Sequence, residues 1–310
     1  MLLGRYIFNC VFQSEAVLPG YKGSTVRGVF GRALKSVVCA LRCRECLECL
    51  LSKQCLYAIF FENIGEDRDN SLRVTPPYVI EPPYDSKKHY SPGDPFVFTL
   101  LLFGKYNESL PYFIYAMEQM GTIGIGKRIN GKAAKYTLES VFVNGHNIYS
   151  SKERVFTRHD FITDIGFNYF NPAADDMEVS LLGVRLITPL RVKYHNHLHL
   201  PLPFHILVRA SLRRVSHLYN AFGEGEPPFD YPGMVSRAQS VQVVKEELHW
   251  HDWQRFSLRQ EQKMLMGGVT GYVVYEGNLG EFLPLLRFCE QVHIGKQTTF
   301  GLGKIELFYP

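Results

Sequence analysis

The sequence lacks an uninterrupted apolar run close to the ~18 residues of a membrane helix. Its longest apolar stretch, 96–103, is interrupted by Thr99. The first residues, MLLGRYIFNCVF, place Gly4, Arg5 and Asn9 where the apolar core of a secretory signal would lie, and no small-residue cleavage site follows. These absences argue against a membrane partner and make a cytoplasmic location the expectation.

Signatures of several enzyme classes are missing as well. Neither a G-x-x-x-x-G-K-[ST] phosphate loop nor a G-x-S-x-G nucleophile elbow occurs. Asp175 and Asp176 stand without the further carboxylates that a two-metal nuclease needs. The sequence therefore gives no support to P-loop, serine-hydrolase or two-metal chemistry.

The composition is that of a folded protein with a patterned positive charge. Of the 310 residues, 46% are hydrophobic and 21% charged, which excludes disorder, and the length indicates two domains. The net charge is only +4, but residues 16–44, 119–138 and 291–305 contain lysines and arginines without any acid. Such segments suit a polyphosphate partner, although ordinary solvated faces would give the same pattern.

Cysteines are concentrated in one short segment. Five of the seven lie between residues 39 and 55, and without a signal sequence such clustering favours metal over disulfides. A C-x6-C-x2-C-x5-C pattern is formed by Cys39, Cys46, Cys49 and Cys55. Four thiolates suit a structural zinc, an iron–sulfur cluster has similar needs, and free or buried thiols are the alternative without metal.

Strands are expected at Leu2–Phe12, at LYAIFFE after the cysteine segment and at Tyr136–Val143, and Ser24 is the expected N-cap of a helix over 25–41. The order of expected elements repeats. Strand, helix, two strands, helix and strand follow one another in each half, and LPYFIYAMEQM (from Leu110) and LPLLRFCEQVHI (from Leu283) each lead through glycines into a last strand. We therefore predict an α+β fold of two ferredoxin-like (RRM-like) βαββαβ domains. The N-terminal domain spans 1–149 with a metal-binding insertion at 39–55, a connection spans 150–175, and the C-terminal domain spans 176–310 with a glycine-rich loop at 295–303.

Two glycine-rich loops precede the last strands. Gly295, Gly301 and Gly303 flank Lys296 and Thr298, and glycines at 121–131 accompany further cations. Glycine lets backbone N–H groups approach a phosphate, although most such loops are only turns. His293 adjoins the second loop and could act as a general base, or serve as an ordinary histidine at a helix C-terminus.

Several segments together resemble a known family. They include LPGYKGSTVRGVFGRAL (18–34), the cysteine pattern followed by IFFE, PYVIEPP, SPGDPFVFTLLLFG, LPYFIYAMEQMG, HDWQRFSLRQ, MGGVTGYVVYEG and HIGKQTTFGLG (293–303). The chain resembles the CRISPR-associated RAMP-type endoribonucleases that process precursor repeat RNA for antiviral defence, in the subgroup with a cysteine-bearing N-terminal domain. The final glycine-rich segment is the most specific of these marks.

The resemblance implies a reaction and a fold of two ferredoxin-like domains. Such enzymes need no metal for catalysis: the ribose 2′-OH attacks the adjacent phosphate and leaves a 2′,3′-cyclic phosphate. Many relatives carry a catalytic histidine near the first helix, but residues 21–38 contain none. Our hypothesis for the catalytic set is therefore Tyr21, Lys22 and His293, because the reaction needs a base, an acid and cations.

The resemblance also implies binding partners. CRISPR repeat RNA is the expected ligand, other CRISPR effector subunits are further partners, and the chain is expected as a monomer or homodimer. The residues assigned to RNA binding are Arg27, Lys127, Arg128, Arg255, Arg259, Lys296, Thr298 and Lys304. Two alternatives stay open: a non-catalytic RNA-binding subunit of an effector complex, and a metal-stabilised protein-interaction module.

Overall fold

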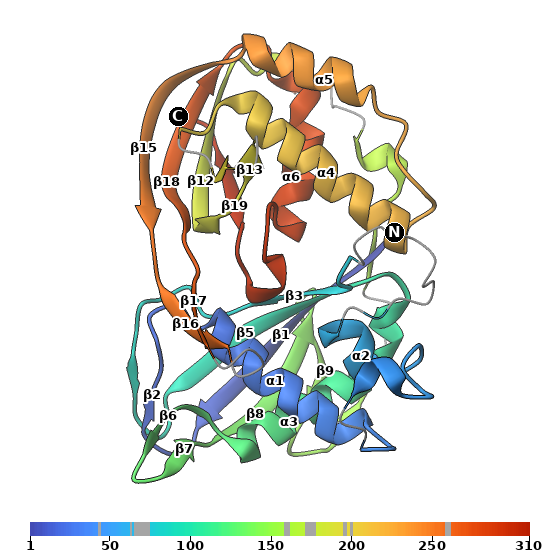
Figure 1. Ribbon diagram of the computed structural model, residues 1–310, viewed down its shortest axis with the longest axis vertical. Helices are drawn as coiled ribbons and strands as arrows, with labels where there is room; N and C mark the ends of the chain where they lie inside the picture. Colours follow the sequence, from blue (N-terminus) through green and yellow to red (C-terminus); the bar gives the residue numbers. More distant parts are fainter. Residues whose placement is uncertain are drawn as a thin grey trace. The chain divides into compact units, whose positions relative to one another are not determined.

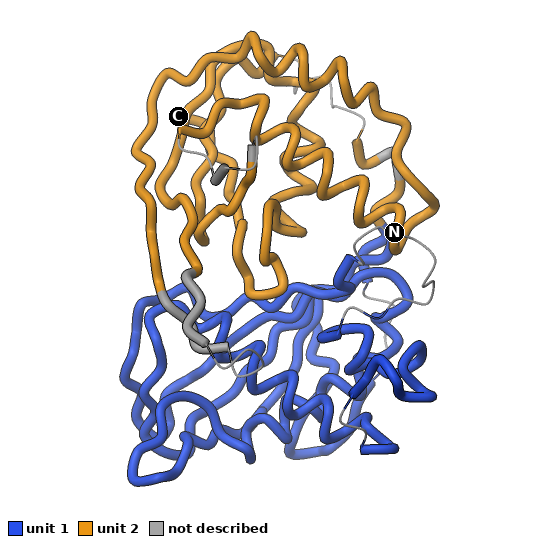
Figure 2. Tube along the Cα trace, in the orientation of Figure 1, with its two compact units in different colours: residues 1–164 blue, residues 165–310 orange. Residues whose placement is uncertain are grey.

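The computed structural model describes residues 1–310 apart from 43–44, 63, 65–74, 158–161, 171–177, 195–196, 199–200 and 258–261. The chain forms two compact units, Met1–Asp164 and Ile165–Pro310, which are coloured separately in Figure 2. All described strand pairs in both units are antiparallel. None of the described helices is long and apolar enough to cross a bilayer.

The first unit is built on a sheet in the order β10-β9-β8-β1-β5-β3, with β11 paired to β1 (Figure 1). Within it, β1, α1, β3, β5, α3 and β8 follow the β-α-β-β-α-β order, and the first and third strands are central. Its elements are β1 (Leu2–Phe12), β2 (Ala16–Val17), α1 (Gly23–Val38), α2 (Leu56–Phe61), β3 (Tyr78–Glu81), β4 (His89–Tyr90), β5 (Pro95–Phe103), α3 (Leu110–Ile123), β6 (Ile125–Ile129), β7 (Lys132–Ala134), β8 (Tyr136–Val143), β9 (His146–Ser150), β10 (Val155–Phe156) and β11 (Thr163–Asp164), with 3-10 turns at Cys46–Glu48 and Gly104–Ser109.

The core of the first unit is rich in aromatic rings. Alternate residues of β1, from Tyr6 through Phe8 to Phe12, are buried, as the period of two in a strand requires. Phe8 stacks on Phe98 of β5, with ring centroids 5.3 Å apart. The apolar stripe of α1, including Phe30, packs beside α3 and closes this core. The same alternation and helical spacing predicted these elements from the sequence.

The second unit repeats the plan on a four-stranded sheet in the order β15-β18-β12-β19. The central strands, β12 and β18, are again the first and third of a β-α-β-β-α-β series completed by α4, β15, α6 and β19. Its elements are β12 (Leu181–Leu190), β13 (Lys193–Tyr194), β14 (His197–Leu198), α4 (Phe204–Phe222), α5 (Tyr231–Arg237), β15 (Gln242–His251), β16 (Gln254–Ser257), β17 (Gln262–Leu265), β18 (Gly268–Glu276), α6 (Leu283–Val292) and β19 (Ile305–Phe308), with 3-10 turns at Phe167–Phe170, Ala238–Ser240, Gly280–Phe282 and Thr298–Phe300.

Two local expectations are wrong. The segment LYAIFF, expected as a strand, is helix α2, in which the Phe60 ring stacks on Tyr78 at 4.9 Å and packs on Phe113 at 4.8 Å. A short apolar run does not distinguish helix from strand, so tertiary packing decided it. Lys22, and not Ser24, is the N-cap of α1, and no side chain caps that end. A third expectation differs in its bounds: of the connection expected at 150–175, the part up to Asp164 belongs to the first unit and includes β10 and β11.

Candidate functional site

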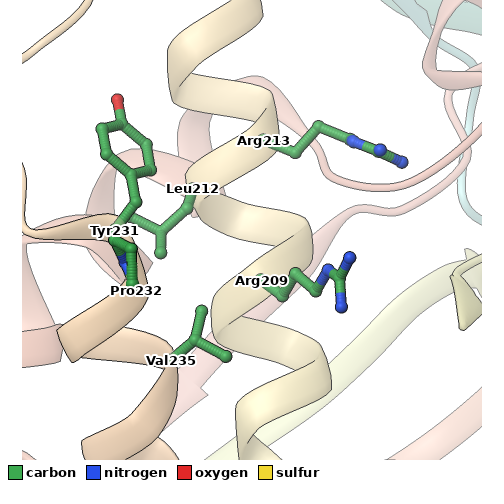
Figure 3. Close-up of a pocket in the computed structure, with 6 residues that line it drawn as sticks. All are labelled: Arg209, Leu212, Arg213, Tyr231, Pro232 and Val235. Atoms are coloured by element: carbon green, nitrogen blue, oxygen red, sulfur yellow. The ribbon is translucent and has the colours of Figure 1, made fainter.

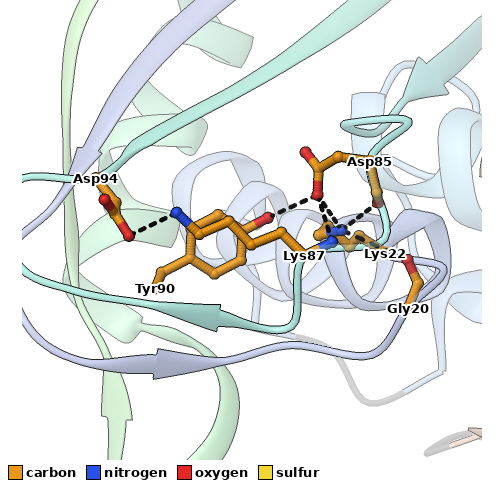
Figure 4. Close-up of polar contacts among 6 residues, drawn as sticks. All are labelled: Gly20, Lys22, Asp85, Lys87, Tyr90 and Asp94. Carbon is orange, nitrogen blue, oxygen red and sulfur yellow. Dashed lines mark hydrogen bonds and ion pairs between the residues drawn. The ribbon is translucent and has the colours of Figure 1, made fainter.

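Lys22, expected as a catalytic residue, is fully buried at the start of α1. Its Nζ donates to the backbone oxygen of Asp85 at 2.7 Å, to Asp85 Oδ1 at 3.0 Å and to the backbone oxygen of Gly20 at 3.4 Å (Figure 4). These bonds tie the beginning of α1 to the loop that follows β3. The amine is therefore held by acceptors inside the first unit.

Asp85 is the centre of this polar cluster. Partial burial acts to raise the pKa of Asp85, but hydrogen bonds from Lys22 and from the Lys87 backbone N–H outweigh it and lower the pKa. Tyr90 also donates to Asp85 Oδ1 at 3.4 Å, and the Lys87 ammonium forms an ion pair with Asp94 at 2.8 Å. Figure 4 shows the two ion pairs on either side of the Tyr90 ring.

Replacement of Lys22 by methionine is expected to lower the free energy of unfolding by about 1 to 3 kcal/mol, because charge-assisted hydrogen bonds are lost. A lowered pKa of Asp85 means that its contribution is present above the unfolded pKa and is lost as the pH falls through the folded pKa. Denaturant titrations should therefore show a smaller difference between wild type and variant in acid than at pH 7. The exposed Lys53→Met is the control, and an equal effect of both substitutions would contradict the structural role of Lys22.

Tyr21 lies beside a buried carboxylate. Burial, and secondly the charge of Glu81, raise the pKa of Tyr21 above its usual range. Glu81 is buried at the end of β3, and its Oε2 pairs with Arg5 Nη2 at 2.5 Å. Burial raises the pKa of Tyr84 as well, and Tyr84 bonds to Glu81. Both phenols therefore stay protonated at neutral pH, so they can donate a proton or a hydrogen bond.

The cationic side chains of the first unit that are expected to bind RNA lie in different environments. Arg27, on α1, lies with its guanidinium carbon 4.8 Å from the centre of the Phe61 ring and bonds to Tyr78. Lys127 and Arg128 are exposed on β6, where Arg128 donates to the Gly131 backbone oxygen at 3.4 Å. Only the latter pair presents its charge to solvent in the way that phosphate contacts need.

The glycine-rich loop of the second unit is a closed structure. Ile294 N–H donates to the Gly303 oxygen at 2.9 Å, and Lys296 N–H donates to the Arg191 oxygen at 2.9 Å. Gly303 has a φ of +76°, and a Cβ there would lie 1.8 Å from the Ile294 oxygen, so only glycine fits. Thr188 Oγ1 donates to the Gly301 oxygen at 2.8 Å and accepts from Lys304 N–H at 2.9 Å. The loop is therefore preformed by bonds within its own backbone and by bonds to Thr188 and Arg191.

Arg214 of α4 holds the entrance to this loop. Its guanidinium is buried and donates from Nη2 to the Val292 oxygen at 2.8 Å and from Nε to the His293 oxygen at 3.1 Å. These carbonyls end helix α6, where a cation is favoured by the helix dipole. Burial lowers the pKa of Arg214 to about 10, which leaves it charged at neutral pH.

His293 is fully buried at the start of the loop and has a φ of +62°. Its Nδ1 lies 3.0 Å from the Leu302 carbonyl oxygen. Because a carbonyl only accepts, Nδ1 is assigned the proton, and Nε2 is the nitrogen able to accept one. The histidine is thus built into the loop fold.

The remaining residues assigned to RNA are spread along and beyond this loop. Lys296 is half-buried near its tip, Thr298 is buried, and Lys304 is half-buried where its backbone bonds to Thr188. Arg255 lies on β16, and Arg259 lies outside the described residues. Lys296 and His293 are therefore close together in the sequence of this loop, whereas Thr298 is buried and contributes to packing.

Comparison with known proteins identifies the family. Residues 1–161 match the family AF_1859_N, described as an N-terminal domain. Residues 184–305, which include the glycine-rich loop, match the CRISPR-associated endoribonuclease Cas6. The second unit belongs to the Cas6 family. This match to a CRISPR-associated endoribonuclease confirms the resemblance seen in the sequence.

Similar proteins extend over both units of the chain. An uncharacterized protein of Archaeoglobus fulgidus is 28% identical over 292 residues, 92% of this chain and 91% of that protein. A partial Cas6-RT-Cas1–Cas2 complex contains a similar chain (TM-score 0.60, 14% identity); the match covers 100% of this chain but only 46% of that longer one. A Thermus thermophilus Cas6 gives a TM-score of 0.54 at 14% identity, covering 99% and 98% of the two chains. These structures share the antiparallel α+β fold.

In the described part of the chain, the four cysteines expected to bind a metal are not grouped as a set of ligands. Cys39, Cys46, Cys49 and Cys55 are free and half-buried, and burial is the main cause that raises the pKa of Cys46. Among the described residues, no three or more histidine, cysteine or acidic side chains are grouped closely enough to hold an ion. The geometry therefore does not support the zinc prediction, and Cys43 lies outside the described residues.

Sequence reasoning missed Arg214, Asp85 and Thr188, each of which holds a candidate site residue or the glycine-rich loop in place. A signal existed for Arg214, because it falls on the apolar stripe of α4 with Leu207, Ser211 and Leu218. No comparable signal marks Asp85 or Thr188, which bond to residues far along the chain.

Proposed function

We propose that this protein cleaves CRISPR repeat RNA without a divalent metal, by attack of a ribose 2′-OH on the adjacent phosphate. The products are a 2′,3′-cyclic phosphate and a free 5′-hydroxyl, and the released pieces become guide RNAs. The observation that carries this mechanism is the Tyr21 phenol, which directly precedes Lys22 at the start of α1 and, being protonated at neutral pH, can donate its proton to the leaving 5′-oxygen.

The three residues of the proposed catalytic set have different roles. Tyr21 acts as general acid, and Lys22, held by Asp85, positions the turn that carries Tyr21. His293 acts as general base: its Nε2 accepts the proton of the attacking 2′-OH, while its Nδ1 keeps the bond to the Leu302 carbonyl. The exposed cations Lys127 and Arg128, together with Lys296, hold the phosphates of the RNA.

The test is cleavage of end-labelled repeat RNA from its own genome in the presence of EDTA. Cleavage should proceed, and the 5′ fragment should end in a cyclic phosphate. A substrate with one 2′-deoxyribose at the mapped cut should stay intact while binding equally well, because only the nucleophile has been removed. Cleavage of the deoxy substrate, or activity restored only by added magnesium, would contradict the mechanism.

A second candidate function rests on a specific observation. Two of the three candidate catalytic side chains, Lys22 and His293, are fully buried and bonded to backbone carbonyls. A chain of this fold that binds repeat RNA without cutting it, as a subunit of an effector complex, would have the same features. Tight binding of the intact RNA with no product in the same assay would favour this alternative.

A further inference from the structure

Helix α4 carries three arginines with two different environments. Arg214 faces inward, where its guanidinium is bonded to carbonyls of α6. Arg209 and Arg213 are exposed and lie one helical turn apart, so they occupy the same face of α4. Figure 3 shows their side chains extending from α4 in the same direction. The exposed pair therefore forms a two-charge row on the surface of the second unit.

This row borders a pocket between α4 and α5. The pocket has a volume of about 370 Å³, which lies in the range of small-ligand sites. Leu212 extends from α4 towards α5, whereas the guanidinium ends of the arginines point the other way (Figure 3). The aliphatic parts of the two arginine side chains therefore line the pocket, and their charged ends extend away from it. The lining residues are Arg209, Leu212, Arg213, Tyr231, Pro232 and Val235.

The described acids next to the pocket are already engaged with other groups. Asp230 caps α5 by accepting from Gly233 N–H at 3.0 Å, and it also pairs with Arg237 at 3.2 Å. Glu281 binds Arg237 at 2.7 Å. Glu226 bonds to the Tyr231 hydroxyl, which orients that ring. The lining itself contains two cations and no acid, so the pocket has a net positive charge.

We propose that this pocket seats one unpaired base of the repeat RNA, with the flanking phosphates on Arg209 and Arg213. A lining that combines the apolar Leu212, Pro232 and Val235 with one aromatic ring suits a base, and guanidinium groups bind phosphate through paired hydrogen bonds. The inference rests on the proposed RNA-binding function and adds a subsite on α4 and α5, away from the glycine-rich loop residues in the sequence. It is independent of cleavage chemistry.

The test measures binding of fluorescent repeat RNA to the full chain at several salt concentrations. The double variant Arg209→Gln/Arg213→Gln should lower the slope of log affinity against log salt by about 1.4, because each phosphate contact on a single strand contributes about 0.7. The same slope gives an affinity loss of about 25-fold at 0.1 M salt, shrinking towards none at 1 M. The control Lys152→Gln/Arg154→Gln removes two exposed charges from the first unit and should change the slope much less.

A second variant tests the base pocket by itself. Val235→Trp should fill the pocket and weaken binding about 5-fold or more without changing the salt slope, because base stacking is lost but phosphate contacts are kept. Wild-type affinity and slope in both variants would overturn the subsite while leaving the proposed function intact. Failure of the wild-type chain to bind repeat RNA would instead overturn the proposed function. Displacement of RNA from wild type by polyglutamate, lost in the double variant, would assign the pocket to an acidic peptide and overturn the RNA proposal.

Discussion

Replacement of Tyr21 by phenylalanine is expected to slow cleavage of repeat RNA by about 100-fold or more, the usual contribution of a positioned general acid. The substitution removes only the hydroxyl group, because phenylalanine keeps the ring and its packing. A tyrosine phenol is protonated at neutral pH, and burial and the charge of Glu81 raise the pKa of Tyr21 further, so the leaving 5′-oxygen can receive its proton. Single-turnover cleavage in EDTA measures the rate without product release.

The control is Tyr112→Phe, which removes the same hydroxyl from an exposed position on α3 and should leave the rate unchanged. RNA affinity and unfolding midpoint should match wild type in both variants. The rate that depends on Tyr21 should not fall up to about pH 9, because an acid with a raised pKa keeps its proton there. A Tyr21→Phe enzyme with the full rate would remove Tyr21 from the mechanism and leave the endoribonuclease assignment standing.

Replacement of Arg214 by methionine is expected to lower the free energy of unfolding by about 2 to 6 kcal/mol. The Val292 and His293 carbonyls would lose their buried donors, and each unsatisfied buried group costs about 1 to 3 kcal/mol. Methionine fills a similar volume, so the effect would come from the lost hydrogen bonds more than from a cavity. Denaturant unfolding, followed by circular dichroism, measures the difference.

The neighbouring Arg213→Gln is a matched control, because it removes an exposed guanidinium from the same helix. Its effect should stay within about 0.5 kcal/mol, as is usual for surface sites. Arg214→Lys should recover part of the stability, because an ammonium can reach one carbonyl but does not reproduce the spread of the guanidinium. Equal stability of Arg214→Met and wild type would show that the α6 terminus is held by other contacts.

The larger elements could be predicted from local pattern. The strand at Leu2–Phe12 and the strand at Tyr136–Val143 have the predicted bounds, because alternation of apolar residues is a local property with a period of two. The helix α3 begins at Leu110 as expected, with Pro111 in its first turn. The duplicated β-α-β-β-α-β order could also be predicted, because each copy repeats the same series of strand-like and helix-like hydrophobic patterns.

Shorter segments were decided by packing. Leu56–Phe61 forms a helix because its aromatic rings find partners on β3 and α3, which the sequence places far away. The cysteine spacing allowed a four-thiolate site, but spacing along the chain does not establish that four sulfur atoms converge. Spacing is a necessary condition for a metal site, and only the fold supplies the rest.

The sequence by itself determined the fold class, the duplication, the family and the positions of the two glycine-rich loops, because these depend on residue order and local conformation. The tertiary structure decided the state of each functional side chain. It paired the buried Lys22 with Asp85, set the pKa of Tyr21 beside Glu81, and bonded His293 to Leu302. Burial and hydrogen-bond partners come from chain segments that meet only after folding, and so no local pattern could reveal them.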